Sequence, residues 1–583
     1  MNRATARADE DPAPSGEPIA LLEPASGHPV LVEEPSSPAR GALRRAVPIL
    51  YAVWIAAIAA LFFLHFPHLL ADFPNRSPWM DYSKYTDEGW YSNAAVRYTL
   101  TGHWYLRGDF NPAVALPVWP VLLAGVFHFT GVSLAADRAL ALVFFGLNLF
   151  LAWRLVRTQA PRWAALLAVT LLATNPFLWA FSRLALLEPP LIFFLLLSWL
   201  LALRLPGASA RARTGMLIAI GLLLCLMTLT KTTAIFFLPS TLFLVARAYG
   251  SRLRSLRALI LTTLSAALPW CAYYFLLVRP HYRVDYQYLF DANHWPQPTT
   301  FTGWIAAFGW ALHGSFWISA TLSVTALALL ALALIPPPPA RSSALTLFPH
   351  LDEDPGSSPG LWRNPLLIAS LIAAAGCIFF VGWHNNPQPR YYAPIAWPLC
   401  FILALGVADL LRRSRPGVLS TTLSTILRIA CACALATLAA VSVAGAIQIA
   451  RYLRHPEYTF VNAARSITQY IDAHPERHRL LLSISGDDIR LITGLPAICD
   501  DYGPWDLAYR IHNYRPGWYA TWNELDNGTV ADLSTQYSLQ RVAAFSAFDD
   551  PDRDVLILYR MDLLPSARQT YAAHDEEVGN AGR

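Results

Sequence analysis

The sequence predicts a polytopic α-helical membrane protein with a small α/β domain after its last membrane span. Of its 583 residues, 55% are hydrophobic and 14% are charged, whereas a soluble domain has about 45–50% apolar and about 25% charged residues. The apolar residues gather in blocks of about 20, the length with which a helix crosses a bilayer. After about residue 450 the pattern changes to short strand-like runs between turn-rich pieces.

The N-terminal part divides into a polar tail and a first membrane anchor. Residues 1–45 are rich in Pro, Ala, Glu and Ser and contain no long apolar run, which predicts a disordered tail. The apolar block at 46–70 is longer than the core of a signal peptide, which has about 7–15 residues, so we expect it to stay as an anchor. Arg40, Arg44 and Arg45 precede this block, and the positive-inside rule places the tail in the cytoplasm.

Further apolar blocks follow, so the region 46–449 is expected to hold about 11 transmembrane helices. These blocks lie near 136–153, 163–181, 187–203, 214–230, 233–248, 258–278, 316–335, 365–383, 393–411 and 425–448. A stretch at 113–130 is ambiguous because it is apolar but contains Pro117, Pro120 and His128. If it lies in the interface or re-enters, the later Arg-rich loops all face the cytoplasm, as the positive-inside rule requires. The chain after about residue 450 then lies outside.

The C-terminal part, 450–583, is expected to form a small extracytoplasmic α/β domain. It contains a segment with a helical pattern and short strand-like runs, among them RLLLSIS, WYATW and DVLILYR. Six of the seven cysteines lie in apolar blocks and Cys499 stands alone in this part, so no disulfide framework is predicted. The net charge is only +5, and there is no basic cluster interleaved with aromatic residues, so no nucleic-acid partner is expected.

The first outer loop, 71–135, holds the richest set of candidate residues. Asp87 and Glu88 are consecutive in the aromatic-rich segment TDEGWY. Adjacent positions on a helix point about 100° apart, so the two acids need not share one site. A solvated loop with interfacial helices is the alternative interpretation, because Trp and Tyr favour the membrane interface.

A second acid lies where a later span begins. Glu188 in SRLALLEPP precedes two prolines at the start of an apolar block. A carboxylate there can simply interact with the positive end of the helix dipole, or it can serve chemistry at the membrane surface. Arg183, in the same segment, is a candidate partner for Glu188 or a separate phosphate ligand.

Cations and one histidine complete the candidates on the predicted outer face. Lys231, one of only two lysines, follows an apolar block and can bind a lipid phosphate or extend toward lipid headgroups. Arg390 lies in the short loop WHNNPQPRYY, and arginine binds phosphate with two hydrogen bonds. His384 in the same loop is a candidate metal ligand, although the sequence has no zinc-type spacing of Cys and His.

Carboxylates and cations on one face of a membrane suit one type of reaction. A leaving group that is a lipid phosphate needs cations to stabilise the charge that develops on it. An acceptor hydroxyl or amine needs a carboxylate base within hydrogen-bond reach. The expected reaction is therefore an in-line displacement at the anomeric carbon of a sugar, and the aromatic loop RPHYRVDYQYLFDANHWPQP could cover the site as a lid.

Several of these segments, in this order, also resemble a known family. The segments are TDEGWY with Asp87 and Glu88, GVSLAADRAL, SRLALLEPP with Glu188, GLLLCLMTLTKTTAIFFLP with Lys231, and RYYAPIAWP with Arg390. Over roughly residues 50 to 400 the chain resembles the GT-C integral-membrane glycosyltransferases. The similar branch contains protein O-mannosyltransferases, the lipid A aminoarabinose transferase and lipopolysaccharide-core transferases of the RgtA/B/C/D-like type.

The resemblance implies a polyprenyl-phosphate sugar as donor and a lipid, a glycan or a protein as acceptor, in a bacterial inner membrane. Asp87 would be the catalytic base, and Glu88 and Glu188 would orient the acceptor, support the base or help to hold a metal. Lys231 and Arg390 would hold the lipid phosphate. The resemblance leaves a divalent metal open as a cofactor. The sequence has no clear carboxylate-x-carboxylate motif that would bind one, so no metal ligands are assigned.

Two other classes of protein compete with a glycosyltransferase. A transporter or flippase of lipid-linked substrates would carry ionisable residues near the middle of its spans and broken helices at matching positions of two halves. Here the middles of the spans are nearly free of acids and the charges collect on one face. A non-catalytic envelope assembly subunit would use its spans only as anchors. Replacement of Asp87 separates the classes, because only an enzyme would lose activity without losing its place in the membrane.

Overall fold

The computed structural model describes residues 38–293, 295–335, 360–414, 421–523 and 525–567. Residues 1–37 of the predicted tail at 1–45 lie outside the described residues, and the backbone of the first helix begins at Pro38. The chain divides into two units, Met1–Trp54 and Ile55–Arg583. The membrane helices after residue 54 and the C-terminal sheet belong to the same unit, and the following description concerns that unit.

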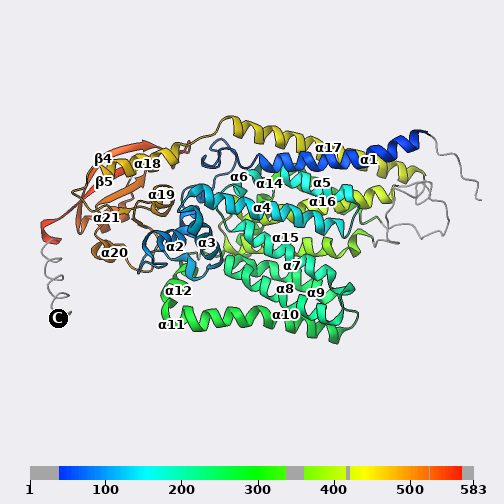
Figure 1. Ribbon diagram of the computed structural model, residues 1–583, viewed down its shortest axis with the longest axis horizontal. Coiled ribbons are helices and arrows are strands. Elements are labelled where there is room, and N and C mark those ends of the chain that lie inside the picture. The colour runs from blue at the N-terminus through cyan, green and yellow to red at the C-terminus, as the bar shows by residue number, and fades with distance from the viewer. Residues whose placement is uncertain (1–37, 294, 336–359, 415–420, 524, 568–583) are drawn as a thin grey trace, which may run out of the picture. The chain divides into compact units, whose positions relative to one another are not determined.

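The part of the chain before the sheet is almost entirely helical (Figure 1). Short 3₁₀ turns connect several helices, and η1 (Tyr82–Lys84), η4 (Thr232–Phe237) and η7 (Pro389–Tyr392) matter below. The helices are α1 (Pro38–Phe63), α2 (Asp87–Thr101), α3 (Val118–Thr130), α4 (Leu134–Arg157), α5 (Arg162–Ala173), α6 (Pro176–Ser182), α7 (Glu188–Arg204), α8 (Ala210–Thr230), α9 (Leu238–Arg247), α10 (Arg252–Tyr273), α11 (Arg279–His281), α12 (Arg283–Ala292), α13 (Phe301–Gly314), α14 (Phe316–Leu332), α15 (Pro365–His384), α16 (Ala393–Arg413) and α17 (Thr421–Arg454).

The multi-span fold class is confirmed, and the structure shows how the expected blocks are divided into helices. Among the described residues, 8 helices are long and apolar enough to cross a membrane, or up to 10 if each of two bent pairs is one span. The blocks expected at 163–181 and 316–335 belong to those pairs, α5 with α6 at 64° and α13 with α14 at 88°. The block expected at 233–248 is a shorter apolar run, Thr232–Arg247. Each of the 10 spans in the upper count among the described residues corresponds to one expected block, and the remaining expected block, at 233–248, is the shorter apolar run.

The bend between α5 and α6 has a local cause in the sequence. The side chain of Asn175 accepts a hydrogen bond from the Leu178 backbone N–H at 3.1 Å, and Pro176 occupies the first position of α6. Asparagine as N-cap followed by proline is a strong signal for a new helix. The apolar block is therefore continuous in composition but interrupted in backbone direction.

Helix α3 corresponds to the ambiguous stretch at 113–130. It has 13 residues and is therefore about 20 Å long, well short of the roughly 30 Å of hydrocarbon in a bilayer. If α3 does not cross the membrane, the Arg-rich loops all lie on the cytoplasmic side, as the positive-inside rule requires. The orientation of the termini stays a prediction.

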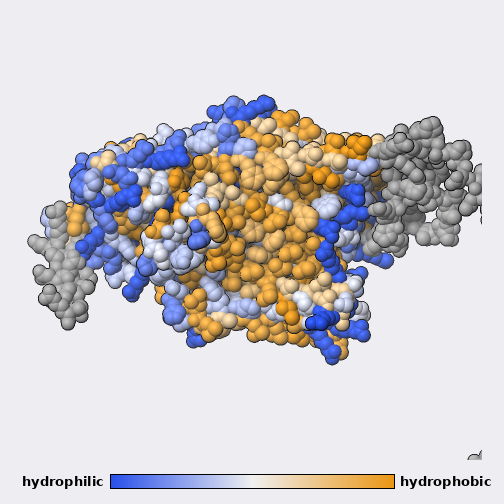
Figure 2. Space-filling view, viewed as in Figure 1, coloured by the Kyte–Doolittle hydropathy of each residue, from blue (hydrophilic) through white to orange (hydrophobic). Residues whose placement is uncertain are grey.

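The surface of the long helices is suited to lipid. On α10, large apolar side chains are exposed at every fourth position, at Leu256, Ile260, Leu264 and Leu268. Residues four apart share one face of a helix, so these side chains form an apolar stripe. Figure 2 shows hydrophobic residues over the long helices, whereas hydrophilic residues gather over the β4, β5 and α18 region.

The C-terminal part forms the small α/β domain that was expected. Its elements are α18 (Thr459–Asp472), β1 (Leu481–Leu482), α19 (Gly486–Thr493), β2 (Ala497–Ile498), α20 (Leu507–Tyr514), β3 (Trp518–Trp522), α21 (Asn527–Ser534), β4 (Tyr537–Ser546) and β5 (Val555–Leu563). The strand order is β2-β1-β3-β5-β4. Strand β1 runs parallel to β2 and β3, whereas β5 runs antiparallel to β3 and β4.

The first loop and this domain share a hydrophobic core. Tyr85, immediately before α2, is buried in the same cluster as Phe460, Trp518 and Trp522 of the C-terminal domain. Helix α2 also packs directly on α19, and Figure 1 shows the two helices side by side. The domain thus covers the loop that carries the Asp-Glu pair.

Candidate functional site

Asp87 begins α2 and is directed into a buried charged environment. Its side chain is 1% exposed, and its Oδ2 lies 3.1 Å from Nε of Arg390. The hydroxyl of Thr86 donates a hydrogen bond to its Oδ1 at 3.1 Å. Neither Asp87 Oδ2 nor Arg390 Nε has a well-directed hydrogen bond in the described structure. The contact is therefore a charge pair that leaves the carboxylate oxygen able to accept a proton.

Arg390 stands between two carboxylates. It comes from η7, and its guanidinium forms an ion pair with Asp81 as well as with Asp87. Asp81 also accepts hydrogen bonds from the backbone N–H of Arg390 and of Ser83, each at 2.9 Å. Asp81 therefore holds Arg390 in place through both its side chain and its backbone.

A second ion pair lies beside the first. Lys231, which follows the last residue of α8, forms a buried ion pair with Glu188 at the start of α7. The Lys231 ammonium lies 5.3 Å from the ring centre of Tyr391, and the Arg390 guanidinium lies 4.9 Å from the same centre. Tyr391 thus joins the two pairs into one group. We call Asp81, Asp87, Glu188, Lys231 and Arg390 the charged cluster.

The cluster sets the basicity of Asp87. Burial raises the pKa of the Asp87 carboxyl, the charge of Arg390 opposes that rise, and the charge of Asp81 adds to it. Lys231 and Glu188 act on the same pKa with opposite signs. A carboxylate with a raised pKa is a stronger base while it is ionised. The environment therefore suits Asp87 to proton abstraction better than that of an exposed aspartate.

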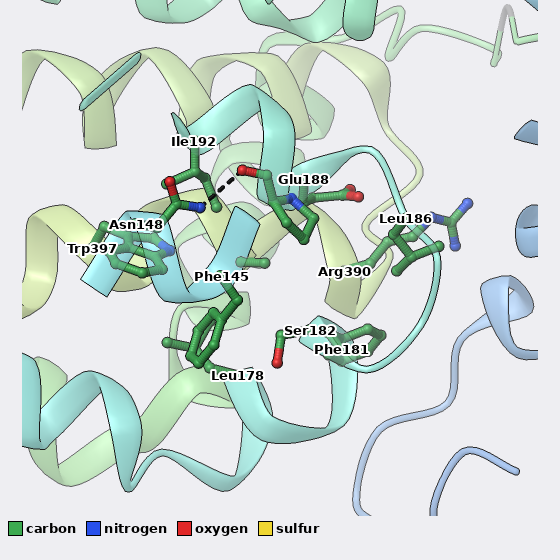
Figure 3. Close-up of a pocket in the computed structure, with 12 residues that line it drawn as sticks. Phe145, Asn148, Leu178, Phe181, Ser182, Leu186, Glu188, Ile192, Arg390 and Trp397 are labelled. Carbon is green, nitrogen blue, oxygen red and sulfur yellow. Dashed lines mark hydrogen bonds between the residues drawn. The ribbon is translucent and has the colours of Figure 1, made fainter. Parts of the chain in front are cut away.

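A small cavity adjoins the cluster (Figure 3). Its volume is about 20 Å³, which is room for about one water-sized group. Glu188 and Arg390 line it together with Asn148, Ser182 and Trp397. Asn148 Oδ1, Ser182 Oγ and Trp397 Nε1 are buried without a hydrogen-bond partner in the described structure. A wall with both donors and acceptors suits hydroxyl groups, and a whole sugar enters only if neighbouring side chains move.

The structure places Glu88 away from the charged cluster. Its two carboxylate oxygens accept hydrogen bonds from Arg138 at 2.8 and 2.6 Å, and Oε1 also accepts from the backbone N–H of Ala185 at 2.8 Å. Arg138 belongs to α4. Glu88 therefore ties α2 to α4 and to the segment before α7, because its position on the helix points to a different side from Asp87. The expected catalytic role of Glu88 stays a prediction, and in this geometry its carboxylate is occupied by Arg138 and Ala185.

Arg183 lies outside the charged cluster, and His384 borders it through Tyr391, with 5.9 Å between the ring centres. The Arg183 guanidinium donates hydrogen bonds to the backbone carbonyls of Pro67 and His68 at 2.9 and 2.5 Å. It therefore anchors the chain after α1, and its role as a phosphate ligand stays a prediction. The His384 ring stacks on Phe380, with 5.2 Å between ring centres. In the part of the chain that the structure describes, no group of three His, Cys, Asp or Glu residues could hold a metal, so metal binding stays a prediction.

Sequence reasoning missed three parts of this site. Asp81 had a usable signal, because it lies in the same loop as Asp87. Arg138 lies in the segment GVSLAADRAL, which was noted without a role. The third part is the segment SISGDDIRLITG of the C-terminal domain, whose Asp487 and Asp488 contact α2.

Comparisons with known proteins agree with this architecture. Residues 112–274 match the family model PMT_2, described as dolichyl-phosphate-mannose-protein mannosyltransferase. The structure of ArnT from Cupriavidus metallidurans bound to undecaprenyl phosphate is similar, with a TM-score of 0.55 and 12% identity over 87% of this chain and 98% of that one. The structure of the same protein in its apo state matches with a TM-score of 0.53 and 13% identity, over 88% of this chain and 98% of that one.

A more distant structural match is the oligosaccharyltransferase of Archaeoglobus fulgidus in its apo form. Its TM-score is 0.47, with 11% identity over 87% of this chain and 76% of that one. No curated protein sequence matches this chain significantly. At 12% and 13% identity, the two ArnT structures establish a shared fold.

Proposed function

We propose, from the premise that this chain is a membrane protein of the GT-C glycosyltransferase superfamily, that it transfers a sugar from a polyprenyl-phosphate donor to an acceptor. The acceptor is a lipid, a glycan or a protein at the outer face of a bacterial inner membrane. The observation that carries the proposal is the charged cluster, in which a buried carboxylate lies 3.1 Å from an arginine and next to the Lys231–Glu188 pair.

The proposed reaction is a single displacement with inversion at the anomeric carbon. Asp87 takes the proton from the acceptor hydroxyl or amine as the acceptor atom forms its bond to that carbon. The bond between the carbon and the phosphate oxygen breaks, and the lipid phosphate leaves with the electron pair. A base that acts in the transition state contributes about 10²- to 10⁴-fold in rate.

Arg390 and Lys231 are the groups proposed to hold the leaving phosphate. In the structure both cations are already paired, Arg390 with Asp81 and Asp87 and Lys231 with Glu188. A phosphate that enters must share or replace these contacts. A cation held in place before the reaction stabilises the developing charge without reorganisation at the moment of transfer.

Two further observations support the lipid-phosphate donor. The similar ArnT structure is one bound to undecaprenyl phosphate, which is a statement about that protein. In this chain the apolar helices α7 and α8 meet the charged cluster, which lies at the start of α7 and just after the end of α8. The proposal accordingly puts the phosphate at the helix ends and the lipid along the apolar helices.

The test follows a radiolabelled sugar from polyprenyl-phosphate donors in membranes that contain wild type, Asp87→Asn or Asp472→Asn. Asp472 forms an ion pair with Arg479, and its side chain is 46% exposed, so its variant is a matched control. We expect transfer with wild type and with Asp472→Asn, and a loss of about 10²- to 10⁴-fold with Asp87→Asn.

Two outcomes would contradict the proposal. If Asp87→Asn keeps the wild-type rate, Asp87 is not the base. If folded wild type transfers no sugar from a broad donor panel, the enzymatic interpretation fails and the transporter and assembly-subunit classes become the better explanations.

A further inference from the structure

The first turn of α2 receives a hydrogen-bond acceptor from the distant C-terminal domain. The backbone N–H of Gly89 donates to Oδ1 of Asp488 at 3.1 Å. The first N–H groups of a helix have no partner within the helix, and the N-cap side chain usually accepts one of them. The N-cap residue Thr86 makes no such bond, because its hydroxyl interacts with Tyr82 and Asp87. Asp488 takes over the capping role.

The approach of the two helices depends on a glycine. A Cβ at position 89 would collide with the backbone of Asp487 and Asp488. Helix α19 therefore lies directly on the α2 backbone, in the gap that only glycine leaves. Such a contact between two backbones allows little play, so the position of α19 fixes the position of the first turn of α2.

Further buried contacts hold the next turns of α2 on the same domain. The Asn93 side-chain amide donates to Asp487 Oδ2 at 3.0 Å, and the Arg97 guanidinium lies 3.4 Å from Asp487 Oδ1. Arg97 also pairs with Asp109 at 2.8 Å. These residues are nearly fully buried. The whole first half of α2 is thus fixed relative to α19.

Asp488 itself is buried at 3% exposure. Burial, followed by the nearby charge of Glu88, raises the pKa of its carboxyl well above the ordinary range. Its Oδ2 has no hydrogen-bond partner in the described structure. The contact that Asp488 makes with α2 is the acceptance of the Gly89 N–H by one carboxyl oxygen.

We propose that Asp488 is a positioning residue for sugar transfer. By capping α2 from the C-terminal domain, it holds Asp87 at its contact with Arg390. This inference rests on the proposed function, since it assigns part of the reaction geometry to a domain that contributes no member of the charged cluster. A misplacement of about 1 Å at a reacting group can cost about 10²-fold in rate.

The test compares full-length Asp488→Ala, Asp488→Asn and Tyr514→Phe proteins with wild type. Asparagine keeps the acceptor oxygen, and alanine removes it. Tyr514 donates a hydrogen bond to the Arg107 carbonyl at 2.5 Å, so Tyr514→Phe loses a contact between the same two regions at a point distant in sequence from Asp87. The readouts are kcat, the donor KM, the pH profile of kcat, thermal stability, and hydrogen exchange of the amides at 88–91.

We expect Asp488→Ala to lower kcat at least 10-fold with a donor KM within about twofold of wild type, because the donor-phosphate contacts remain while the base is misplaced. The acid limb of the kcat pH profile of Asp488→Ala should shift, because the contact of Asp87 with Arg390 changes. The exchange of the 88–91 amides should rise. Asp488→Asn should restore kcat and exchange to near wild type, and Tyr514→Phe should lose stability without a change in kcat.

Several results would overturn the proposal. If the folded Asp488→Ala protein keeps the wild-type kcat, Asp488 only joins the two regions. If Asp488→Asn is as impaired as Asp488→Ala, capping of Gly89 is not the mechanism. If wild type itself transfers no sugar, the proposed function fails and the positioning role fails with it. If Asp488→Ala is active and its 88–91 amides exchange as in wild type, only the positioning role is refuted.

Discussion

Replacement of Glu88 by alanine should damage stability far more than the chemical step. Glu88 accepts two hydrogen bonds from Arg138, at 2.8 and 2.6 Å, and one from the Ala185 N–H at 2.8 Å. Removal of one partner of a buried ion pair costs about 3–5 kcal/mol. The orphaned Ala185 N–H adds about 1–3 kcal/mol. We expect a loss of at least about 3 kcal/mol in the free energy of unfolding.

The assay heats the detergent-solubilised protein and measures the fraction that stays monodisperse at each temperature. Asp87→Asn, one residue away, is the matched control. It should lose transfer while it keeps an unfolding temperature near that of wild type, because Arg390 stays paired with Asp81. The double variant Glu88→Leu with Arg138→Leu should recover part of the loss, because removal of both charges leaves no unpaired ion. The reasoning is refuted if Glu88→Ala unfolds like wild type yet loses transfer as Asp87→Asn does.

The remaining predictions concern the charged cluster. Because burial raises the pKa of Asp87 and Arg390 opposes that rise, the acid limb of kcat should lie above about pH 3.9, the ordinary aspartate pKa. Arg390→Met should move it to higher pH and Asp81→Asn to lower pH, and equal shifts in one direction would contradict the electrostatic argument. Lys231→Met and Glu188→Gln should each lower the unfolding temperature, since each leaves a buried partner unpaired. Their combination should regain stability without transfer, and a double variant that transfers at the wild-type rate would exclude Lys231 from the phosphate site.

The sequence predicted the membrane architecture well because hydrophobic length is a local property. Each apolar block could be read without knowledge of its neighbours, and the long helices lie where the blocks are. The bend at Asn175 and Pro176 was visible as a capping signal, yet it was overlooked because the flanking residues on both sides are apolar. The composition of a block shows that it is apolar enough for a membrane. It does not show where the backbone changes direction, because single residues such as Asn175 and Pro176 decide that.

The site was only partly predictable, because its partners are far apart in the chain. Asp87, Glu188, Lys231 and Arg390 were all expected on the outer face of the membrane, and the structure brings them together. The backbone N–H of Arg390 bonds Asp81 across 309 residues, and no local pattern reveals such a pairing. Glu88 was grouped with Asp87 by sequence adjacency, although adjacent helical positions face different sides.

The contact between α2 and α19 also has a consequence for the time course of biosynthesis. Asp488 follows Gly89 by 399 residues, and a ribosome adds about 5–20 residues per second, so the cap arrives roughly 20–80 seconds after the loop it completes. During that interval the nascent chain presents Arg97 and Asp109 without the domain that later buries them. Each molecule therefore passes through a stage in which its membrane helices are being inserted and its reaction centre is still unfinished, and chaperones and proteases can act on the loop during that stage.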